Sequence, residues 1–460
     1  MEIRLLKTLG RLFQRPRPST PVRPDPPLPA GAADAESKTM PQRYENVPSP
    51  FCGIASDDLL IEVEGPIVRI LEQGDAVTRR GFETPIDSTS PRVDGQPVSL
   101  EAAVQRAADL LRAASCPVFS GFGTDVADTR AAMALVERAR GIFDQATAPA
   151  GLRNLEVVTD SGWMVTTLAE VRNRVDLLVA FGTDIEASFP RFFERFVWPK
   201  ETLFGGEVAA REVIFLGRAP SGSAATSPDG RAPEVYPVAP SDFPLVAAAL
   251  AALAKGETLD APVIGGVTLE TLRALVERLK AARYGVVAWS ARQIDCPHAS
   301  LALERLNQAI ISLNQATRCV GLPLGGQDGD RTATQVCTWL SGYPVRVNYA
   351  RGYPEYDPYH WGTERLLERG EADVLVWVSS IGLTPPPATS IPTIVLARPG
   401  MVLSQEPTVT IPVGVPGIDQ RGLMYRSDGV VALPLKKLRE TGLPSAASVL
   451  AAIEAQLEDQ

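Results

Sequence analysis

Histidine is scarce in this sequence of 460 residues: only His298 and His360 occur, and they form neither an HxH nor an HExxH pair. A metallohydrolase needs three or more nitrogen or oxygen ligands, so this scarcity argues against a histidine-rich catalytic metal centre. A Ser-His-Asp triad would have to recruit one of these two, and no GxSxG motif is present. The sequence also has no GxxxxGK[ST] phosphate loop, and GFGTD at 121–125 lacks the third glycine of a dinucleotide-binding fingerprint.

Long apolar runs and clustered positive charge are also missing. Runs such as VDLLVAFG at 175–182 have strand length, far short of the ~20 residues that span a bilayer. A formal net charge of −9 opposes nonspecific binding to nucleic acid, which needs clustered Lys and Arg. The 5 cysteines include no CxxC pair, and the start lacks the apolar core of a signal peptide. These features predict a reducing, cytoplasmic environment.

The first 45 residues differ in composition from the rest. MEIRLLKTLGRLF predicts a short basic amphipathic helix, and the following RPRPSTPVRPDPPLP is too rich in proline for a helix or a central strand. We interpret 1–45 as a proline-rich extended arm. It is either a disordered leader or a segment that docks on another subunit, and a membrane-surface helix is a third alternative.

From residue 99 the sequence alternates between helix and strand patterns. Ser99 is a predicted N-cap for a helix, and Thr167 with Glu170 forms a capping box before the buried strand pattern at 175–182. This alternation predicts parallel α/β architecture.

A repeat within the chain indicates two related α/β units. The 24 residues from Val98 align without gaps with those from Val267, and RVDLLVAFG at 174–182 resembles EADVLVWVSS at 371–380. The alternative is that any amphipathic helix followed by a buried strand looks like any other. We predict domains at 46–98 (a small β segment), 99–258, 259–400 and 401–460, the last packing back on the core.

If the units are related, ligands should lie in the crevice between them, at the carboxyl ends of the strands. The loops that would line it are GFGTDVAD, GTDIEASFPR, WSARQIDCPH and SSIGLTPPP.

Two further stretches stand out. PSPFCGIASDD at 48–58 places one thiol, Cys52, between the hydroxyls of Ser49 and Ser56, with the spacing of a cluster-binding loop. TWLSGYPVRVNYARGYPEYDP, from residue 338, carries Arg346 and Arg351 between two GYP turns. Its tyrosine and arginine suit an interface or a ligand surface, or else a well-packed irregular loop.

These stretches, with GWMVTTLAEVRNRVDLLVAFGTDIEASFPRFFERFV and GVPGIDQRGLMYRSDGVVALPLKKL, resemble the B subunits of formylmethanofuran dehydrogenases. That family belongs to the molybdopterin/tungstopterin oxidoreductases and includes the beta subunits of bacterial formyltransferase/hydrolase complexes. The resemblance covers residues 46 to about 435. It implies a molybdopterin-oxidoreductase-like fold, with the segment at 46–98 as a cluster-loop-like β segment.

The resemblance also implies a [4Fe–4S] cluster in the redox members, held by C-x2-C-x3-C before two acidic residues and by a fourth cysteine further on. Here Ser49, Cys52 and Ser56 occupy the first three positions. One thiol falls short of the soft ligands that such a cluster needs, and Cys116 could not restore the set alone. We expect the loop to keep its shape without its cluster.

The catalytic tungsten or molybdenum of the family is bound by cysteine or selenocysteine, followed by histidine. The resemblance places Ala150 and Gly151 at these positions. We therefore expect no metal and no pterin cofactor in this chain, although Pro190, Arg191 and the YRSDGV at 425–430 match family positions near the pterin. Those residues also brace the fold.

By this resemblance the chain is expected to be a redox-inactive structural subunit of a complex with amidohydrolase-like, formyltransferase-like and C-type subunits. The complex would convert formyl groups on a tetrahydropterin carrier, by way of a methanofuran-type coenzyme, to formate. The polyanionic tail of that coenzyme would need cations, and Arg191, Arg195, Arg346 and Arg351 are the expected contacts.

Two alternatives remain open from the sequence. The chain could be an active dehydrogenase subunit with unusual ligands such as Ser56 or Glu156, or an unrelated nucleotide-binding α/β protein.

Overall fold

The computed structural model describes residues 40–54, 56–86, 89–204 and 206–458. Most of the predicted extended arm lies outside these residues, and the last part of the range 1–45 runs into the first strand. Among the described residues, no helix is long and apolar enough to cross a membrane.

A three-stranded antiparallel sheet comes first. Its strands are β1 (Gln42–Val47), β2 (Leu59–Glu64) and β3 (Ile67–Glu72), and helix α2 (Ala76–Phe82) follows. In β2 the residues alternate between buried and less buried, the pattern of a strand with one face on a core. That buried face packs against residues of the C-terminal segment, including Val415 and Ile418.

The larger sheet has nine strands in the order β16-β15-β7-β6-β17-β18-β19-β4-β5, and its centre is parallel. The strands are β4 (Arg92–Val93), β5 (Gln96–Pro97), β6 (Pro117–Gly123), β7 (Ile142–Phe143), β15 (Val347–Asn348), β16 (Glu355–Tyr356), β17 (Val374–Ser379), β18 (Thr393–Ala397) and β19 (Val409–Pro412).

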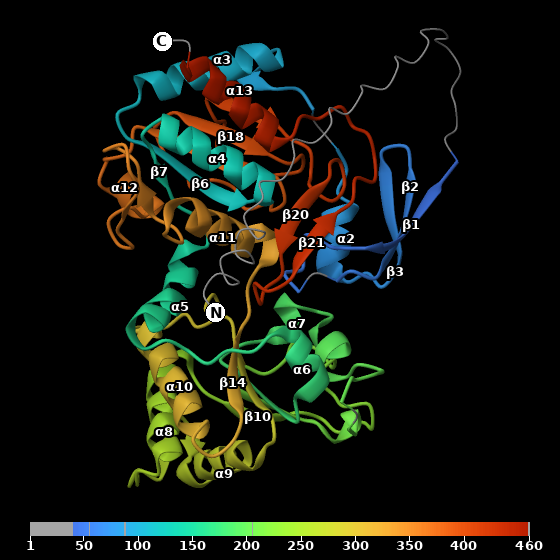
Figure 1. Ribbon diagram of the computed structural model, residues 1–460, viewed down its shortest axis with the longest axis vertical. Helices are drawn as coiled ribbons and strands as arrows, with labels where there is room; N and C mark the ends of the chain where they lie inside the picture. Colours follow the sequence, from blue (N-terminus) through green and yellow to red (C-terminus); the bar gives the residue numbers. More distant parts are fainter. Residues whose placement is uncertain (1–39, 55, 87–88, 205, 459–460) are drawn as a thin grey trace, which may run out of the picture. The chain divides into compact units, whose positions relative to one another are not determined.

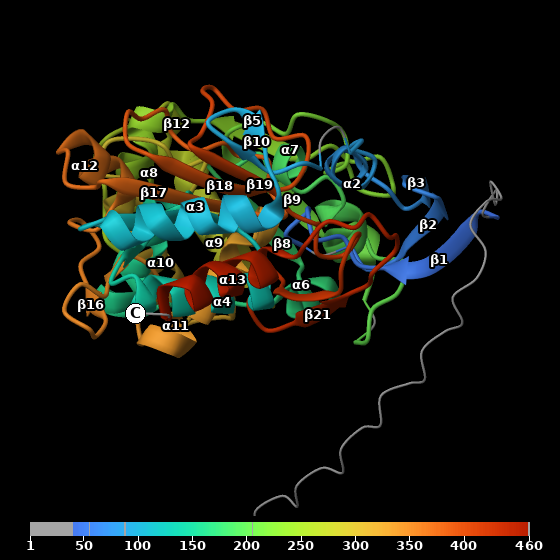
Figure 2. The ribbon, with the colours of Figure 1, turned by 90° about the horizontal axis from the view of Figure 1, so that it is seen from above.

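Helices cover one face of this sheet, as Figure 2 shows for α3 and α13 along β17–β19. They are α3 (Leu100–Ala113), α4 (Val126–Arg138), α11 (Asp330–Ser341) and α13 (Ala446–Glu458), and α12 (Thr363–Glu368) lies with the other face. In β17, Val376 faces the four helices, whereas Leu375 and Trp377 point to the opposite side. Burial on both faces explains why this strand reads as an unbroken apolar run.

The second sheet is entirely parallel, in the order β10-β9-β8-β13-β14. Its strands are β8 (Leu177–Phe181), β9 (Glu212–Gly217), β10 (Glu234–Pro237), β13 (Gly285–Trp289) and β14 (Cys319–Pro323). One face packs on α8 (Phe243–Lys255), α9 (Leu269–Ala281), α10 (Ala299–Leu313) and part of α5 (Ala148–Ser161). The other packs on α6 (Leu168–Arg174), α7 (Ile185–Ser188) and the π-helix η1 (Phe193–Val197).

The predicted boundary at 258/259 is wrong, because the chain crosses between the sheets more than once. The first repeat's helix and strand, α3 and β6, belong to the nine-stranded sheet, whereas β8–β10 belong to the five-stranded sheet with β13 and β14. The repeated elements pair crosswise: β6 lies parallel to β17, and β13 lies parallel to β8. Figure 1 labels β6, β7 and β18 in the nine-stranded sheet and β10 and β14 in the five-stranded sheet. Buried parallel strands all read as similar apolar runs, so a local pattern does not specify the neighbour of each strand.

The C-terminal segment from residue 401 contributes β19, the hairpin β20 (Gly422–Tyr425) and β21 (Ala432–Leu435), and α13. Helix α13 packs on α3 and α4. The remaining short elements are the 3₁₀ helices η2 (Val208–Ala210), η3 (Pro240–Asp242) and η4 (Gln327–Gly329) and the ribbon β11 (Val263–Ile264) with β12 (Val267–Thr268).

Candidate functional site

The loop between β1 and β2 brings together the three side chains at the cluster positions. Ser49, Cys52 and Ser56 are each at most 1% exposed. The backbone N–H of Ser49 donates to the carbonyl of Ser56 at 2.7 Å, and the N–H of Ser56 donates to Cys52 Sγ at 3.2 Å. The Cys52 thiol donates to Ser56 Oγ at 3.6 Å. The loop is thus closed by hydrogen bonds between the same residues that the resemblance assigns to a cluster.

Thr78 adds a third hydroxyl to this group of side chains, and the sequence analysis did not select it. Thr78 in α2 is fully buried, and its Oγ1 lies 3.3 Å from Ser49 Oγ. Thr78 Oγ1 also donates to Asp75, the N-cap of α2, at 2.9 Å. Cys116, the thiol considered for a fourth ligand, instead lies just before β6, where its N–H donates to Asp373. The D-x-x-T spacing of the helix cap was the available signal for Thr78.

This donor set does not fit a [4Fe–4S] cluster. It offers one thiol and three hydroxyls, whereas the cluster needs thiolates. Burial raises the pKa of the Cys52 thiol, and so favours the protonated form that donates to Ser56. Moreover, no group of three or more His, Cys, Asp or Glu in the described part of the chain could hold a metal ion.

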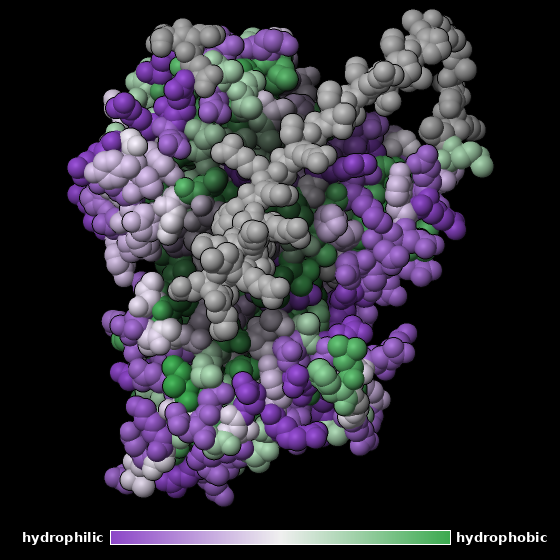
Figure 3. Space-filling model, viewed as in Figure 1, coloured by the Kyte–Doolittle hydropathy of each residue, from purple (hydrophilic) through white to green (hydrophobic). Residues whose placement is uncertain are grey.

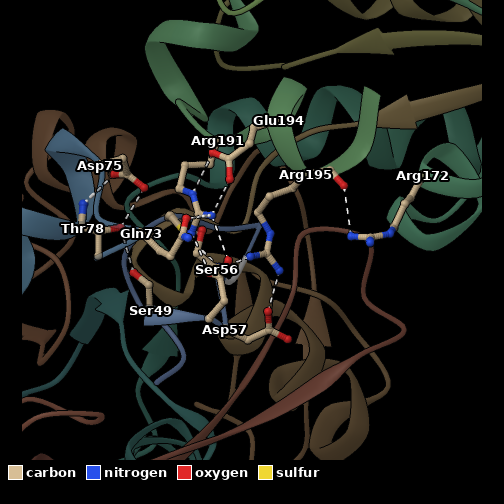
Figure 4. Close-up of polar contacts among 12 residues, drawn as sticks. Ser49, Ser56, Asp57, Gln73, Asp75, Thr78, Arg172, Arg191, Glu194 and Arg195 are labelled. Atoms are coloured by element: carbon tan, nitrogen blue, oxygen red, sulfur yellow. Dashed lines mark hydrogen bonds and ion pairs between the residues drawn. The ribbon is translucent and has the colours of Figure 1, made fainter. Parts of the chain in front are cut away.

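An ion-pair network fastens the loop to the segment after α7 (Figure 4). Arg191, 5% exposed, donates to both carboxylate oxygens of Asp58 at 2.6 and 2.9 Å, to Gln73 at 3.0 Å and to Glu194 at 2.7 Å. Arg195 pairs with Asp57 at 2.5 Å and with Asp58 at 2.7 Å. The two acidic residues at the end of the loop therefore bind Arg191, which precedes η1, and Arg195, which lies in η1.

The charge state of Asp58 follows from these contacts. Burial by itself would raise the pKa of this carboxyl, but the hydrogen bond from Arg191 and the charges of Arg195 and Arg191 outweigh it and lower the pKa. Burial by itself would lower the pKa of Arg191, but the hydrogen bonds to Asp58 and Glu194 and the charges of these carboxylates raise it. The Asp58–Arg191 pair therefore stays ionised at neutral pH.

Gly53 joins the loop to the end of β14. Its φ is +63°, and a Cβ there would lie 2.6 Å from the carbonyl oxygen of Gly325. The Gly53 carbonyl accepts from the N–H of Ser427, and Ser427 Oγ accepts from Gly325 N–H at 3.0 Å. The loop is thus in contact with both the five-stranded sheet and the turn of the β20–β21 hairpin.

A cavity of about 210 Å³ lies where strands of both sheets end. Segments that follow β7, β13 and β14 line it. Of the four loops predicted for the crevice, WSARQIDCPH contributes lining residues, whereas GFGTDVAD, GTDIEASFPR and SSIGLTPPP do not line this cavity. Its lining is Gln145, Thr147, Ala148, Ala150, Gly151, Asn154, Leu155, Trp163, Val165, Thr166, Ser290, Ala291, Arg292, Leu322, Pro323, Leu324, Gly325, Gly326, Gln327, Asp330, Arg331, Thr334, Val345, Ser427 and Asp428.

Ala150, the residue at the predicted metal-ligand position, lines this cavity with Gly151 in the first turn of α5. Neither side chain can coordinate a metal. The alternative ligands Ser56 and Glu156 are not among the lining residues. Ser56 is bonded to Cys52, and Glu156 accepts from the Tyr359 hydroxyl at 2.8 Å. The residues present do not fit the family's metal centre.

The four arginines expected to contact a carrier are not brought together, and each has a protein partner. Arg191 and Arg195 belong to the loop network. Arg346 is mostly buried; it pairs with Asp144 at 3.3 Å and donates to the Pro358 carbonyl. Arg351 is exposed, pairs with Glu355 at 3.0 Å and lies over the Tyr353 ring. None of the four lines the cavity.

The cations that do line the cavity are Arg292 and Arg331, which sequence reasoning did not select. Arg292 lies in WSARQIDCPH, one of the loops predicted for the crevice. Arg331 lies at the start of α11, in a stretch without any recognised motif.

Comparison with models of known protein families finds no match. Comparison with curated proteins finds the B subunit of the tungsten-containing formylmethanofuran dehydrogenase 2 of Methanococcus maripaludis, 26% identical over 407 residues, which are 84% of this chain and 92% of that protein. The B subunit of the formyltransferase/hydrolase complex Fhc of Methylorubrum extorquens is 31% identical over 380 residues, covering 79% of this chain and 97% of that protein.

Among solved structures, a chain of the formyltransferase/hydrolase complex FhcABCD of Methylorubrum extorquens matches with a TM-score of 0.69 and 29% identity. The match covers 80% of this chain and 98% of that chain, and the complex was crystallised with methylofuran. Acetylene hydratase of Pelobacter acetylenicus matches with a TM-score of 0.57 over 90% of this chain and 70% of that chain. Its identity of 9% supports the fold alone. The predicted molybdopterin-oxidoreductase-like α/β fold is confirmed.

Proposed function

Because the chain belongs to the family formed by the B subunits of formylmethanofuran dehydrogenases and of formyltransferase/hydrolase complexes, we propose that it is a redox-inactive structural subunit of such a complex. The complex would move a formyl group from a tetrahydropterin carrier to a methanofuran-type amine and hydrolyse it to formate. Hydrolysis of a formyl amide transfers no electrons, so a complex limited to that reaction needs no iron–sulfur cluster and no tungsten. We place this complex in the cytoplasm.

The donor set of the 48–58 loop is the observation that carries this proposal. The single thiol of Cys52 is hydrogen-bonded to Ser56, and the hydroxyl of Ser49 lies at hydrogen-bond distance from that of Thr78. Ala150 at the predicted metal position supports the same conclusion independently. Two redox centres of the family therefore lack suitable ligands in one chain.

The loop's contacts support a structural role. Through Asp57 and Asp58 it holds two arginines next to the five-stranded sheet, and through Gly53 it holds the hairpin turn at Ser427. We propose that the loop persists because it ties these parts of the chain together and so shapes the surfaces that other subunits contact.

We propose that the exposed face of α11 and the hairpin beside it contacts another subunit of the complex. Trp339 and Leu340 are 54% and 52% exposed, and the ring of Trp339 meets that of Tyr425 edge to face at 5.5 Å. Val430 in the hairpin turn is also exposed. Figure 3 shows hydrophilic residues over most of the displayed surface, with hydrophobic residues in separate patches. An exposed Trp that packs against a Tyr is typical of the centre of an interface.

The test is purification of the tagged chain with its native partners, under anaerobic conditions. We expect amidohydrolase-like, formyltransferase-like and C-type subunits to co-purify, and iron, tungsten and molybdenum to be far below one atom per chain. Stoichiometric tungsten or molybdenum with pterin absorbance would overturn the redox-inactive role, and purification of the chain alone would overturn the complex.

A double variant tests the proposed contact face. Trp339→Ala with Leu340→Ala should keep the Tm of the isolated chain, because both side chains are half-exposed, and should reduce the amount of co-purified partner. The matched control is Leu203→Ala with Phe204→Ala, which removes two exposed apolar side chains elsewhere. Equal co-purification from both double variants would show that the α11 face is not the contact.

A further inference from the structure

We propose that the cavity beside Ala150 binds a small oxyanion, a carboxylate or a phosphate, held by Arg331 and Arg292. This inference rests on the geometry of the cavity and does not depend on the proposed function. The cavity's volume of about 210 Å³ is many times what one water needs, so it has room for an anion of several atoms.

Arg331 supplies the first observation. Arg331 lines the cavity, and its guanidinium forms no hydrogen bond or ion pair with any other residue in the described ranges. Its Nε is buried and lacks a partner. Burial lowers the pKa of Arg331, while the charges of Asp330 and Asp428 act in the opposite direction. A buried guanidinium N–H without an acceptor is costly, and an oxyanion in the cavity would supply acceptors to this group.

Arg292 is a second cation on the same cavity. It lies after β13, and its only ion pair among the described residues is to Asp330 at 3.9 Å, beyond hydrogen-bond distance. Its side chain is 52% exposed, so it lies at the solvent side of the cavity and its donors are free to turn toward a ligand. Two guanidinium groups on one cavity suit bidentate recognition of a carboxylate or a phosphate.

The carboxylates on the cavity do not cancel this charge. Asp428 is already neutralised by Arg426 at 2.5 Å, and it accepts from the N–H of Leu168 at 3.0 Å. Asp330 alone remains opposite Arg292 and Arg331. Counting these lining charges, two arginines face one unmatched carboxylate, and the cavity is left with a positive balance.

Two helices also begin at this cavity. α5 follows Thr147 and α11 follows Gly329, and neither N-cap residue makes a side-chain hydrogen bond to its helix. Ala148 and Ala150 of α5 and Arg331 of α11 line the cavity. The N-terminal ends of helices carry partial positive charge, which adds to the attraction for an anion.

Titration calorimetry and thermal unfolding of the full chain test the proposal. Potassium phosphate, acetate and glutamate are each compared with potassium chloride at the same ionic strength. We expect saturable binding and a rise in Tm with at least one oxyanion and none with chloride. The phosphate and carboxylate arms distinguish the two ligand classes.

Variants assign the binding to the arginines. Arg331→Gln should weaken the Kd about tenfold or more, since it removes a charged hydrogen-bond donor, and Arg292→Gln should weaken it by a smaller factor. Arg351→Gln, which removes the same charge from an exposed ion pair elsewhere, should leave the Kd unchanged. If Arg331→Gln does not fold, Arg331→Lys and the half-exposed Arg292→Gln still carry the test. Absence of saturable binding by the wild type, or an unchanged Kd in both Gln variants, would overturn the proposal.

Discussion

The 48–58 loop and the cavity beside Ala150 differ in how their polar groups are matched. In the loop, the thiol and hydroxyls bond to one another, and Asp57 and Asp58 pair with two arginines. Arg195 Nε has no partner, but the other two nitrogens of the same guanidinium bind Asp57 and Asp58. In the cavity, the guanidinium of Arg331 and an oxygen of Asp330 have no hydrogen-bond partner among the described residues. A buried site whose polar groups are matched needs nothing more, whereas an unmatched one gains free energy from a ligand. We therefore interpret the loop as a structural element and the cavity as a binding site.

A carboxylate without a cation partner among the described residues also occurs in α4, at Asp128. Here we expect the largest effect on stability of the variants considered below. Asp128 in α4 accepts from Ser380 Oγ at 2.5 Å and from Ala447 N–H at 2.9 Å, but no cation pairs with it in the described structure. Burial, and then the charge of Asp125, raises the pKa of Asp128 from 3.8 to about 7. Between these values the folded state holds a proton that the unfolded state has released. The free energy of unfolding therefore falls as pH rises from 3.8 to about 7.

Asp128→Asn should remove this loss, because the amide stays neutral and can keep both hydrogen bonds. At pH 8 the variant is expected to be more stable than the wild type by up to about 4 kcal/mol, and at pH 4 nearly equal. Denaturant unfolding across this range measures it. Asp58→Asn is the contrasting control: the pKa of Asp58 is lowered, so its contribution is present at neutral pH and is lost on acidification. Parallel pH profiles for Asp128→Asn and the wild type would contradict the account.

Arg191→Met removes the cation that holds the loop. The variant leaves Asp58, Gln73 and Glu194 without their shared donor, and we expect a loss of about 3 kcal/mol in the free energy of unfolding. The matched control is Arg351→Met, where an exposed pair with Glu355 is lost and the change should stay below about 0.5 kcal/mol. Equal effects of the two variants in denaturant unfolding would remove the basis for treating the loop network as structural.

Adding volume tests whether the loop is filled and the cavity is open. Ser56→Leu places a larger side chain in a fully buried loop and should cost about 2 kcal/mol. Ala150→Leu adds a larger side chain beside free space and should change stability by less than about 0.5 kcal/mol. Thermal unfolding of both variants provides the comparison, and a cost at Ala150 as large as that at Ser56 would mean that the two regions are packed alike.

Local features of the fold could be predicted well from the sequence. The expected N-cap at Ser99 forms, since its side chain accepts from Ala102 N–H. Of the capping box predicted at Thr167, the bond from Glu170 N–H to the Thr167 side chain forms, while the Glu170 carboxylate pairs with Arg174. Such caps depend only on neighbouring residues. The crosswise pairing of β6 with β17 could not be predicted, because it joins segments far apart in the chain with interchangeable apolar patterns.

The candidate site shows the same division. The positions of Ser49, Cys52 and Ser56 follow from one short loop, and the structure places them together. Thr78 joins them through the packing of α2, and Arg331 becomes significant only because no partner in the described structure reaches its guanidinium. The absence of a hydrogen-bond partner leaves no pattern in the sequence. The sequence therefore pointed to Arg191, Arg195, Arg346 and Arg351, which all have protein partners, and not to Arg331.

Anaerobic reconstitution of the chain with iron and sulfide tests the central claim most directly, with iron content and visible absorbance as the readout. The positive control is the triple variant Ser49→Cys, Ser56→Cys, Thr78→Cys, which supplies four thiols with Cys52. The account predicts that the wild type takes up no stoichiometric iron and shows no cluster absorbance, while the triple variant gains both. A [4Fe–4S] spectrum in the wild type that disappears in Cys52→Ser would contradict it.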